Sequence, residues 1–418
     1  MNHQADIQVL RELTRQYREI AQKPIQDTRR AHWRRLHDRE AVPPAILVNY
    51  GWWNVWCREV FGDDRMQCQD PFYRQHERVL RMEIFHASLG DDYIHEPWLT
   101  HGATQAVGWN DIWGVETRHI RPGVEGGAWK FDPVLRNPED LALLKVPHHR
   151  IDEVKTAAEL ARLTEAVGDL IDIDVWRNPA CLSFMMDIST KLCHLRGLEQ
   201  VMLDMMENPE WLHQVLAFMR DGILINQAEA EAAGDVSLSA HCNQATPYCS
   251  ELPPPRPNAR PAKLKQLWGF CAAQEFTGVS PAMHDEFMIQ YQLPIMQQFG
   301  LSAYGCCEDL TRKIDVLRQI PNLRRIAVTP LANLPASAAQ VGNQYVLSWR
   351  PNPTNMVCCS FDEAAIRRTL RTNLQAAYDH GCCLDITLKD IETVEGDPGR
   401  LARWVTLARE EVSRIWGV

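Results

Sequence analysis

Thiol and carboxyl groups gather at the end of a short apolar run in the last third of the chain. The run starts near Leu301, and Cys306, Cys307 and Glu308 come at its end. Thiolate sulfur and carboxylate oxygen are both zinc ligands, so these three side chains are candidate metal ligands, and Glu275 ahead of the run is a further candidate. The alternative interpretation is a buried core thiol beside a solvated carboxylate, and for Glu275 a solvated helix residue.

Other polar side chains stand at the ends of similar runs. His241 and Glu96 have the chemistry of general bases, and Arg350, followed by Pro351 and Pro353, has that of a clamp for carboxylate or phosphate. Lys389 and Asp390 form a pair in which the cation can neutralise an anionic substrate and the carboxylate can accept a proton. These five are candidate catalytic residues. Each also has a structural alternative, such as a histidine bonded to a backbone carbonyl or an ion pair that only closes the fold.

Eight short apolar or β-branched runs carry these groups, and a helix-like stretch follows each run. Strands that alternate with helices predict a parallel sheet, and eight of them predict a closed (β/α)₈ TIM barrel whose active site lies at the carboxyl ends of the strands. Arg177, after the third run, is therefore a candidate substrate-binding residue. Alternation along the fifth strand predicts that Tyr304, Cys306 and Glu308 share one face. The eight runs are 45–50, 92–97, 170–176, 236–242, 301–308, 324–330, 344–351 and 382–390.

Composition excludes several classes of function. The chain has 418 residues and a formal net charge of −10, and its Lys and Arg residues are scattered, which disfavours a nucleic-acid partner. No apolar run reaches the roughly 20 residues that span a bilayer, and the first 30 residues lack the apolar core of a signal peptide, so we expect a cytoplasmic protein with no membrane partner. The thirteen cysteines are then expected to be reduced thiols. We expect a single domain over 1–418, with a helical arm at 1–40 and the barrel at 41–418.

Several segments, taken in order, resemble the uroporphyrinogen decarboxylase and cobamide (corrinoid) methyltransferase superfamily. They are the helical stretch 197–210, the pattern that starts at Ser280 and Pro281 and leads to Pro294, the strand end 304–307, and the segment 347–353. The resemblance extends over about residues 45–416 and implies a barrel of the uroporphyrinogen decarboxylase-like type with an N-terminal helical arm.

Departures from the family pattern shape what the resemblance implies about the site. The decarboxylases carry an Arg-rich element after the first strand, where this chain has Trp52 and Trp53, which suit a less charged substrate. The methyltransferases bind zinc through a His and a Cys at the fifth strand and a Cys at the eighth. By register, Tyr304 stands in place of that His, Cys306 in place of the first Cys, and Lys389 near the last Cys. Tyr304 is thus a candidate substrate-binding residue.

The resemblance favours a methyltransferase that moves a methyl group between a small methylated substrate and a corrinoid held by a partner protein, with zinc as a second cofactor. One alternative is a decarboxylase or other lyase acting on a cyclic or tetrapyrrole-like substrate, in which Glu96 and His241 manage protons. Another is a non-catalytic corrinoid binder that uses Trp52, Trp53 and Trp56 as a stacking wall. Self-association as a homodimer is a further expectation.

Overall fold

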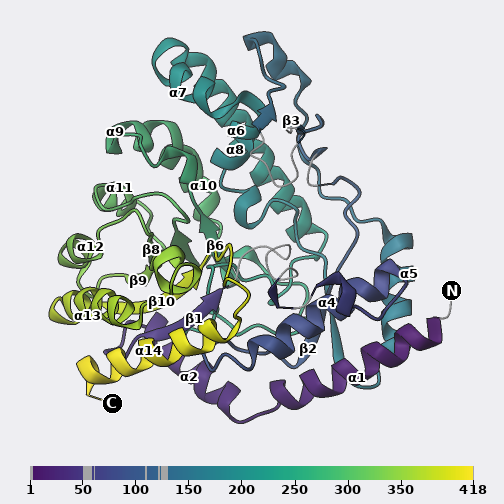
Figure 1. The fold of residues 1–418 in the computed structure, drawn as a ribbon. Coiled ribbons are helices and arrows are strands. Elements are labelled where there is room, and N and C mark those ends of the chain that lie inside the picture. Colours follow the sequence, from purple (N-terminus) through teal and green to yellow (C-terminus); the bar gives the residue numbers. More distant parts are fainter. Residues whose placement is uncertain are drawn as a thin grey trace.

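A curled six-stranded parallel sheet forms the centre of the computed structural model, which describes residues 3–49, 59–60, 62–108, 111–120, 123 and 130–417 (Figure 1). The strand order is β1-β10-β9-β8-β7-β6, and every neighbouring pair is parallel. The sheet closes about half of a barrel. Its strands are β1 (Ala45–Asn49), β6 (Trp268–Cys271), β7 (Leu301–Tyr304), β8 (Leu323–Val328), β9 (Val346–Trp349) and β10 (Cys383–Lys389).

Two further sheets are small. β2 (Trp98–Gly102) and β5 (Asp172–Trp176) form a separate parallel pair, and β3 (Arg118–Ile120) pairs antiparallel with β4 (Lys130–Asp132). Within the described ranges no ladder joins the β2–β5 pair to the six-stranded sheet. The fold is therefore mixed α/β with a parallel half-barrel, and the described part of the chain does not form a fully closed ring of eight hydrogen-bonded strands.

Two of the eight predicted strands are not strands in the structure. Residues 92–97 are a loop, and the strand begins only at Trp98. The polar start of this segment explains the shift, because Asp92 bonds to Ile46 of β1 with both its side chain and its backbone. Its carboxylate accepts from the Ile46 N–H, the donor that a neighbouring strand would use, and its own N–H donates to the Ile46 carbonyl. Residues 236–242 are also irregular, and β6 replaces them. That strand has only four residues, one of them Gly269, so its periodic signal is too short to recognise.

Helices cover the sheet and extend beyond it (Figure 1). The expected N-terminal arm is helical but consists of two helices, with Pro24 at the start of the second. Its first helix buries Leu10, Leu13 and Tyr17 in a cluster with side chains of α4 (Pro71–His86) and α5 (Glu153–Val167). The main helices are α1 (His3–Ala21), α2 (Ile25–His37), α4 (Pro71–His86), α5 (Glu153–Val167), α6 (Ser189–Arg196), α7 (Leu198–Glu207), α8 (Pro209–Ala232), α9 (Pro281–His284), α10 (Gln290–Met296), α11 (Ile314–Leu317), α12 (Leu334–Val341), α13 (Glu363–Asp379) and α14 (Gly399–Trp416).

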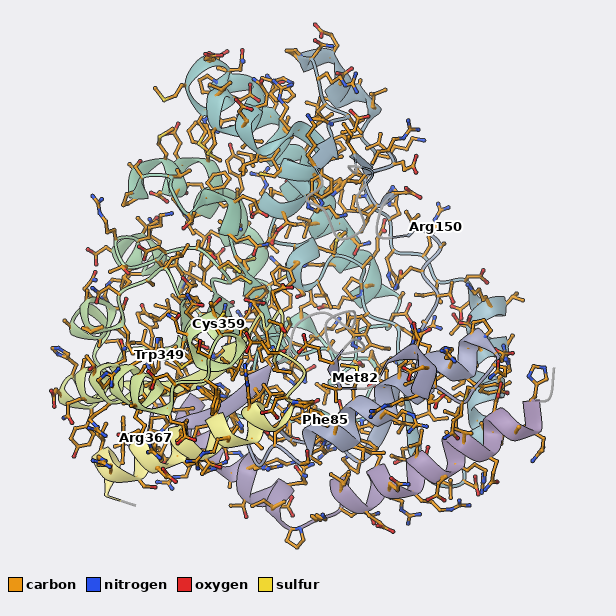
Figure 2. All side chains as sticks on the ribbon, in the orientation of Figure 1. Met82, Phe85, Arg150, Trp349, Cys359 and Arg367 are labelled. Atoms are coloured by element: carbon orange, nitrogen blue, oxygen red, sulfur yellow. The ribbon has the colours of Figure 1, made fainter. Side chains whose placement is uncertain are left out.

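Side chains fill the space between the sheet and these helices (Figure 2). Trp349 at the end of β9 is buried in this packing, and Met82 and Phe85 on α4 lie toward the middle of the molecule. A buried ion pair connects non-adjacent strands, because Arg325 on β8 donates two hydrogen bonds of 2.9 Å to Asp385 on β10. Among the described residues no helix is both long and apolar enough to cross a membrane.

Candidate active site

The turn at the end of β7 decides which way the candidate side chains face. Gly305 has φ +101°, a left-handed conformation that side chains rarely adopt, and it ends the strand. The Tyr304 hydroxyl, just before the turn, donates a 2.8 Å hydrogen bond to Gln292 on α10, in the helix layer. Cys306, just after it, packs instead with Ala303. The expectation that Tyr304 and Cys306 share a face is therefore wrong, because the glycine interrupts the alternation of the strand.

Cys306 contacts a cation that comes from the other side of the half-barrel. The Lys389 ammonium at the end of β10 lies 3.3 Å from the Cys306 sulfur and 3.3 Å from the Asp390 carboxylate. The sulfur of Cys307 lies 3.6 Å from that of Cys306 and 4.0 Å from Asp390. Cys306 is buried and Cys307 is exposed. The fold thus gathers two thiols, one ammonium and one carboxylate at the carboxyl ends of β7 and β10.

These neighbours change how the two thiols ionise. The hydrogen bond from Cys307 lowers the pKa of Cys306 most, burial opposes this, and the positive charges of Lys389 and Arg350 lower it further. The pKa of Cys307 is raised, because its proton is shared with Cys306 and because it is partly buried. One thiolate is therefore held on Cys306, next to an ammonium.

Glu308 and Arg350 fix the backbone around this thiol. The two oxygens of the buried Glu308 carboxylate accept hydrogen bonds from the backbone N–H groups of Ala273, at 2.7 Å, and Cys306, at 2.8 Å. Arg350 donates to the Cys306 carbonyl and to the Gln244 side chain, the latter at 2.6 Å. Gln244 has a positive φ and was not predicted as a site residue, since nothing in its sequence neighbourhood marks it.

The donor set does not fit the zinc site that the sequence suggested. Among the described residues there is no group of three or more His, Cys, Asp or Glu side chains placed to hold a metal ion. Glu308 uses both oxygens on backbone amides, and Lys389 stands beside Cys306. The Glu275 carboxylate accepts a 2.7 Å hydrogen bond from Ser189 and does not join the thiols in such a group. A structural or catalytic zinc needs at least three protein ligands, which this arrangement does not supply.

Glu96 and His241 lie at the amino ends of strands, away from the carboxyl ends that carry Cys306. Glu96 precedes β2, where it pairs with Arg30 at 2.9 Å and accepts a 2.6 Å hydrogen bond from Tyr248. The Nδ1 atom of His241 accepts a hydrogen bond of 3.1 Å from the first backbone N–H of β6, at Trp268. Burial lowers the pKa of His241 to about 4, so its imidazole is neutral.

Two other groups of predicted substrate-binding residues stand apart from the thiols. Arg177 is committed to Asp235 and Glu153, each at 2.5 Å, on the side of the molecule formed by β5 and α5. Trp52 and Trp53 lie outside the described residues, as does Trp56 of the proposed stacking wall.

Two cavities lie near the candidate residues. One, of about 940 Å³, is lined by the β3–β4 hairpin, α6 and α7, and Glu275 is its only predicted site residue among the described ones. The other, of about 530 Å³, is lined by the end of β1, by α4 and by the segment 241–246. The described lining of the smaller cavity includes the predicted catalytic residue His241, but it includes neither thiol nor Lys389. Its links to the thiol site are indirect, through Gln244, the partner of Arg350, and Asn49, which pairs with Lys389 in the sheet.

Comparisons with known proteins agree with this fold. No family model and no curated protein matches the sequence. A solved structure of a methyltransferase from Methanosarcina mazei is similar, with a TM-score of 0.50 and 12% sequence identity, and the alignment covers 92% of this chain and 98% of that chain. The chain shares its fold with that methyltransferase over nearly the whole of both chains.

Proposed function

We propose that this chain is an enzyme that transfers a methyl group between a small methylated substrate and a corrinoid carried by a partner protein. The single observation that carries the proposal is the 3.3 Å contact between the Lys389 ammonium and the Cys306 sulfur at the carboxyl ends of β7 and β10, the end at which α/β barrels hold their active sites. The fold shared with a methyltransferase supports the choice of reaction.

The site residues can stabilise the heteroatom that loses the methyl group. When the bond between that heteroatom and the methyl carbon breaks, the electron pair stays on the heteroatom, and a charged hydrogen-bond donor stabilises it. Lys389 is such a donor. The Cys306 sulfur and the Asp390 carboxylate, each 3.3 Å away, hold the ammonium in a largely buried position. The corrinoid, when its carrier is bound, supplies the methyl acceptor.

A direct test mixes the protein with cob(I)alamin, as a surrogate for the partner's corrinoid, and a panel of methyl ethers, methylamines and methyl thioethers under anoxic conditions. Formation of methylcob(III)alamin is followed by absorbance. Lys389→Met is expected to lower kcat by about 10²-fold, because it removes the charged donor while the fold is kept. Lys155→Met is the matched control, since this exposed lysine on α5 makes only a 3.9 Å ion pair with Glu159. Wild-type activity in Lys389→Met contradicts the assignment.

The alternatives gain no support of their own. A lyase that moves protons with Glu96 and His241 needs both groups at one site with the substrate, and the structure commits each to partners at the amino ends of strands. A corrinoid binder built on Trp52, Trp53 and Trp56 depends on residues outside the described ranges.

A further inference from the structure

The two thiols after β7 are neighbours in the chain and also at their sulfur atoms. Cys306 and Cys307 lie in a bend that follows Gly305, and their sulfurs are 3.6 Å apart. Successive side chains of a regular strand point to opposite faces of the sheet, so adjacent cysteines in a strand do not meet in this way. The bend after the glycine replaces that alternation and turns both thiols to the same side.

A second pair of adjacent cysteines shows what the strand geometry does. Cys382 and Cys383 stand at the start of β10, and their thiols donate to two different segments. The Cys382 sulfur lies 3.7 Å from the carbonyl of Ala338 on α12, and the Cys383 sulfur lies 3.6 Å from the carbonyl of Glu40, which follows α2. Adjacency in the sequence is therefore not what brings the sulfurs of Cys306 and Cys307 together.

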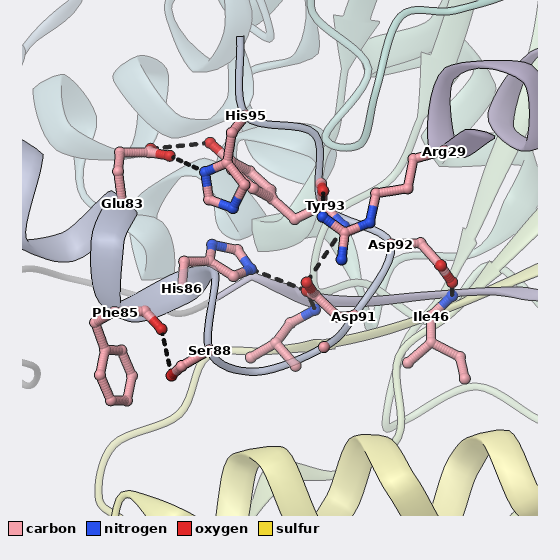
Figure 3. A network of polar contacts seen from close by, with 12 residues as sticks. Arg29, Ile46, Glu83, Phe85, His86, Ser88, Asp91, Asp92, Tyr93 and His95 are labelled. Atoms are coloured by element: carbon pink, nitrogen blue, oxygen red, sulfur yellow. Dashed lines mark hydrogen bonds and ion pairs between the residues drawn. The ribbon is translucent and has the colours of Figure 1, made fainter. Parts of the chain in front are cut away.

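The ionisable side chains beside the smaller cavity offer a contrast (Figure 3). His86 on α4 lies 2.9 Å from the Asp91 carboxylate, and His95 lies 2.9 Å from the Glu83 carboxylate, which also accepts a 3.0 Å hydrogen bond from Tyr93. Acids and bases in this network already satisfy one another by hydrogen bonding. Two sulfur atoms in contact can do more, because they can form a covalent bond to each other when they lose electrons.

Charges around the pair favour reaction at Cys306. The hydrogen bond from Cys307 and the positive charges of Lys389 and Arg350 lower the pKa of Cys306 to about 6, and thiolates are the form that hydroperoxides oxidise. The same hydrogen bond raises the pKa of Cys307, which therefore keeps its proton. The Lys389 ammonium, 3.3 Å from the Cys306 sulfur, is placed to protonate an oxygen that leaves from that sulfur's attack.

Exposure and backbone geometry make the oxidation both accessible and reversible. Cys307 is exposed and Asp390 is half exposed, so a molecule as small as hydrogen peroxide can approach the buried sulfur from their side. Adjacent Cα atoms are about 3.8 Å apart, below the usual disulfide range of about 4.4–6.8 Å, so a disulfide here is strained and easily reduced. Hydrogen bonds from the Cys306 N–H to Glu308 and from Arg350 to the Cys306 carbonyl also oppose movement of this backbone.

We propose that Cys306 and Cys307 form a site of reversible oxidation, at which a hydroperoxide converts the two thiols to a disulfide and a small dithiol restores them. The inference goes beyond the proposed function and does not depend on it. The disulfide carries no charge, so the Lys389 ammonium then keeps Asp390 as its anionic partner but loses the thiolate. Oxidation therefore changes the charge around the lysine that the proposed methyl transfer uses.

The reaction has two steps. In the first, the Cys306 sulfur attacks the terminal oxygen of the hydroperoxide, the O–O bond breaks, and the leaving oxygen takes a proton from Lys389, which regains one from solvent. Cys306 is then a sulfenic acid. In the second, the Cys307 sulfur attacks the Cys306 sulfur, the S–O bond breaks, and the departing hydroxide takes the Cys307 proton to form water. The two sulfurs together lose two electrons, which the peroxide gains.

Equimolar hydrogen peroxide tests the pair in the wild-type protein. After the reaction the protein is unfolded in urea, alkylated with N-ethylmaleimide and studied by peptide mass spectrometry. We expect Cys306 and Cys307 to be joined and unalkylated, and dithiothreitol to make both available to the reagent again. Cys382 and Cys383 serve as the internal control and should be alkylated throughout. Free thiols at 306 and 307, or a disulfide from either one to another cysteine, overturn the inference.

Single variants separate the roles of the two sulfurs and the lysine. Cys307→Ser should stop at the Cys306 sulfenic acid, which dimedone traps, and Cys306→Ser should leave Cys307 a free thiol over the same time. Oxidation of Cys307 at the wild-type rate in Cys306→Ser would overturn Cys306 as the attacking sulfur.

Lys389→Met should slow disulfide formation by about 10²-fold, because the leaving oxygen loses its proton donor, and Lys155→Met should react as the wild type. An unchanged rate in Lys389→Met would overturn the role given to the lysine. The wild-type measurement decides the disulfide itself, so the inference stays testable even where a variant fails to fold. No methyl transfer enters the readout, and a failure of the proposed function leaves these results unaffected.

Discussion

The pKa of Cys306 is lowered most by the hydrogen bond from Cys307 and further by the positive charges of Lys389 and Arg350, and Lys389→Met removes one of these two cations. The ammonium lies 3.3 Å from the sulfur, and Coulomb's law with an effective dielectric constant of about 20 gives roughly 5 kcal/mol for unit charges at that separation. The Asp390 carboxylate, also 3.3 Å from the ammonium, takes part of this interaction, and water reaches the site because Asp390 is half exposed. A rise of about 1–2 units in the thiol pKa is therefore expected on substitution.

The sign of the effect follows from the charges. The wild-type thiol has a pKa of about 6, so it is a thiolate at neutral pH and becomes protonated only as the pH falls below that value. Without the ammonium, the negative form loses one of the two positive charges that stabilise it, and the titration of Cys306 moves to higher pH. The measurement is the ultraviolet absorbance of the thiolate as a function of pH, taken as the difference between each protein and the same protein carrying Cys306→Ala.

Lys155→Met again serves as the control, and its titration should coincide with that of the wild type. The reasoning is refuted if Lys389→Met titrates at the wild-type pH. It is refuted equally if the wild-type difference spectrum shows an ordinary thiol that ionises near 9.0, the usual value for this group.

Three further changes test how the site is held. Gly305→Ala should destabilise the fold by about 1–3 kcal/mol, because its φ is +101° and an added Cβ would lie 2.6 Å from a methyl group of Leu310. Gly278→Ala is the control: open space surrounds Gly278, so this variant should unfold at the wild-type denaturant concentration. Arg325→Met should lower the free energy of unfolding in urea by about 3–5 kcal/mol, because it leaves the Asp385 carboxylate buried without its positive partner. The double variant Arg325→Met/Asp385→Leu should recover much of that loss. A double variant no more stable than the single one would contradict this. Glu308→Gln should lower stability by about 1–3 kcal/mol, because an amide cannot accept both backbone hydrogen bonds, and unchanged thermal unfolding would argue against that clamp.

The periodicity of the sequence was sufficient to predict an α/β fold with a parallel sheet. Strands β1, β5, β7, β9 and β10 fall within predicted runs, and β8 begins one residue before its run, because apolar and β-branched segments bounded by polar or turn residues report local backbone preference directly. The same preference failed at residues 92–97 and 236–242. There the chain is held by side-chain and loop hydrogen bonds, such as that of Asp92 to β1, which no local pattern reveals.

The same distinction between local pattern and tertiary contact applies to the candidate site. The sequence identified Cys306 and Lys389 as groups at two strand ends, far apart along the chain, but only the curl of the sheet and the turn at Gly305 bring ammonium and sulfur to 3.3 Å. The commitment of Glu308 to two backbone amides, and the pairing of His86 with Asp91 beside a cavity, likewise depend on tertiary contacts. Residue type is fixed by the sequence, whereas pKa and available partners depend on burial and on neighbours that arrive only when distant segments pack together.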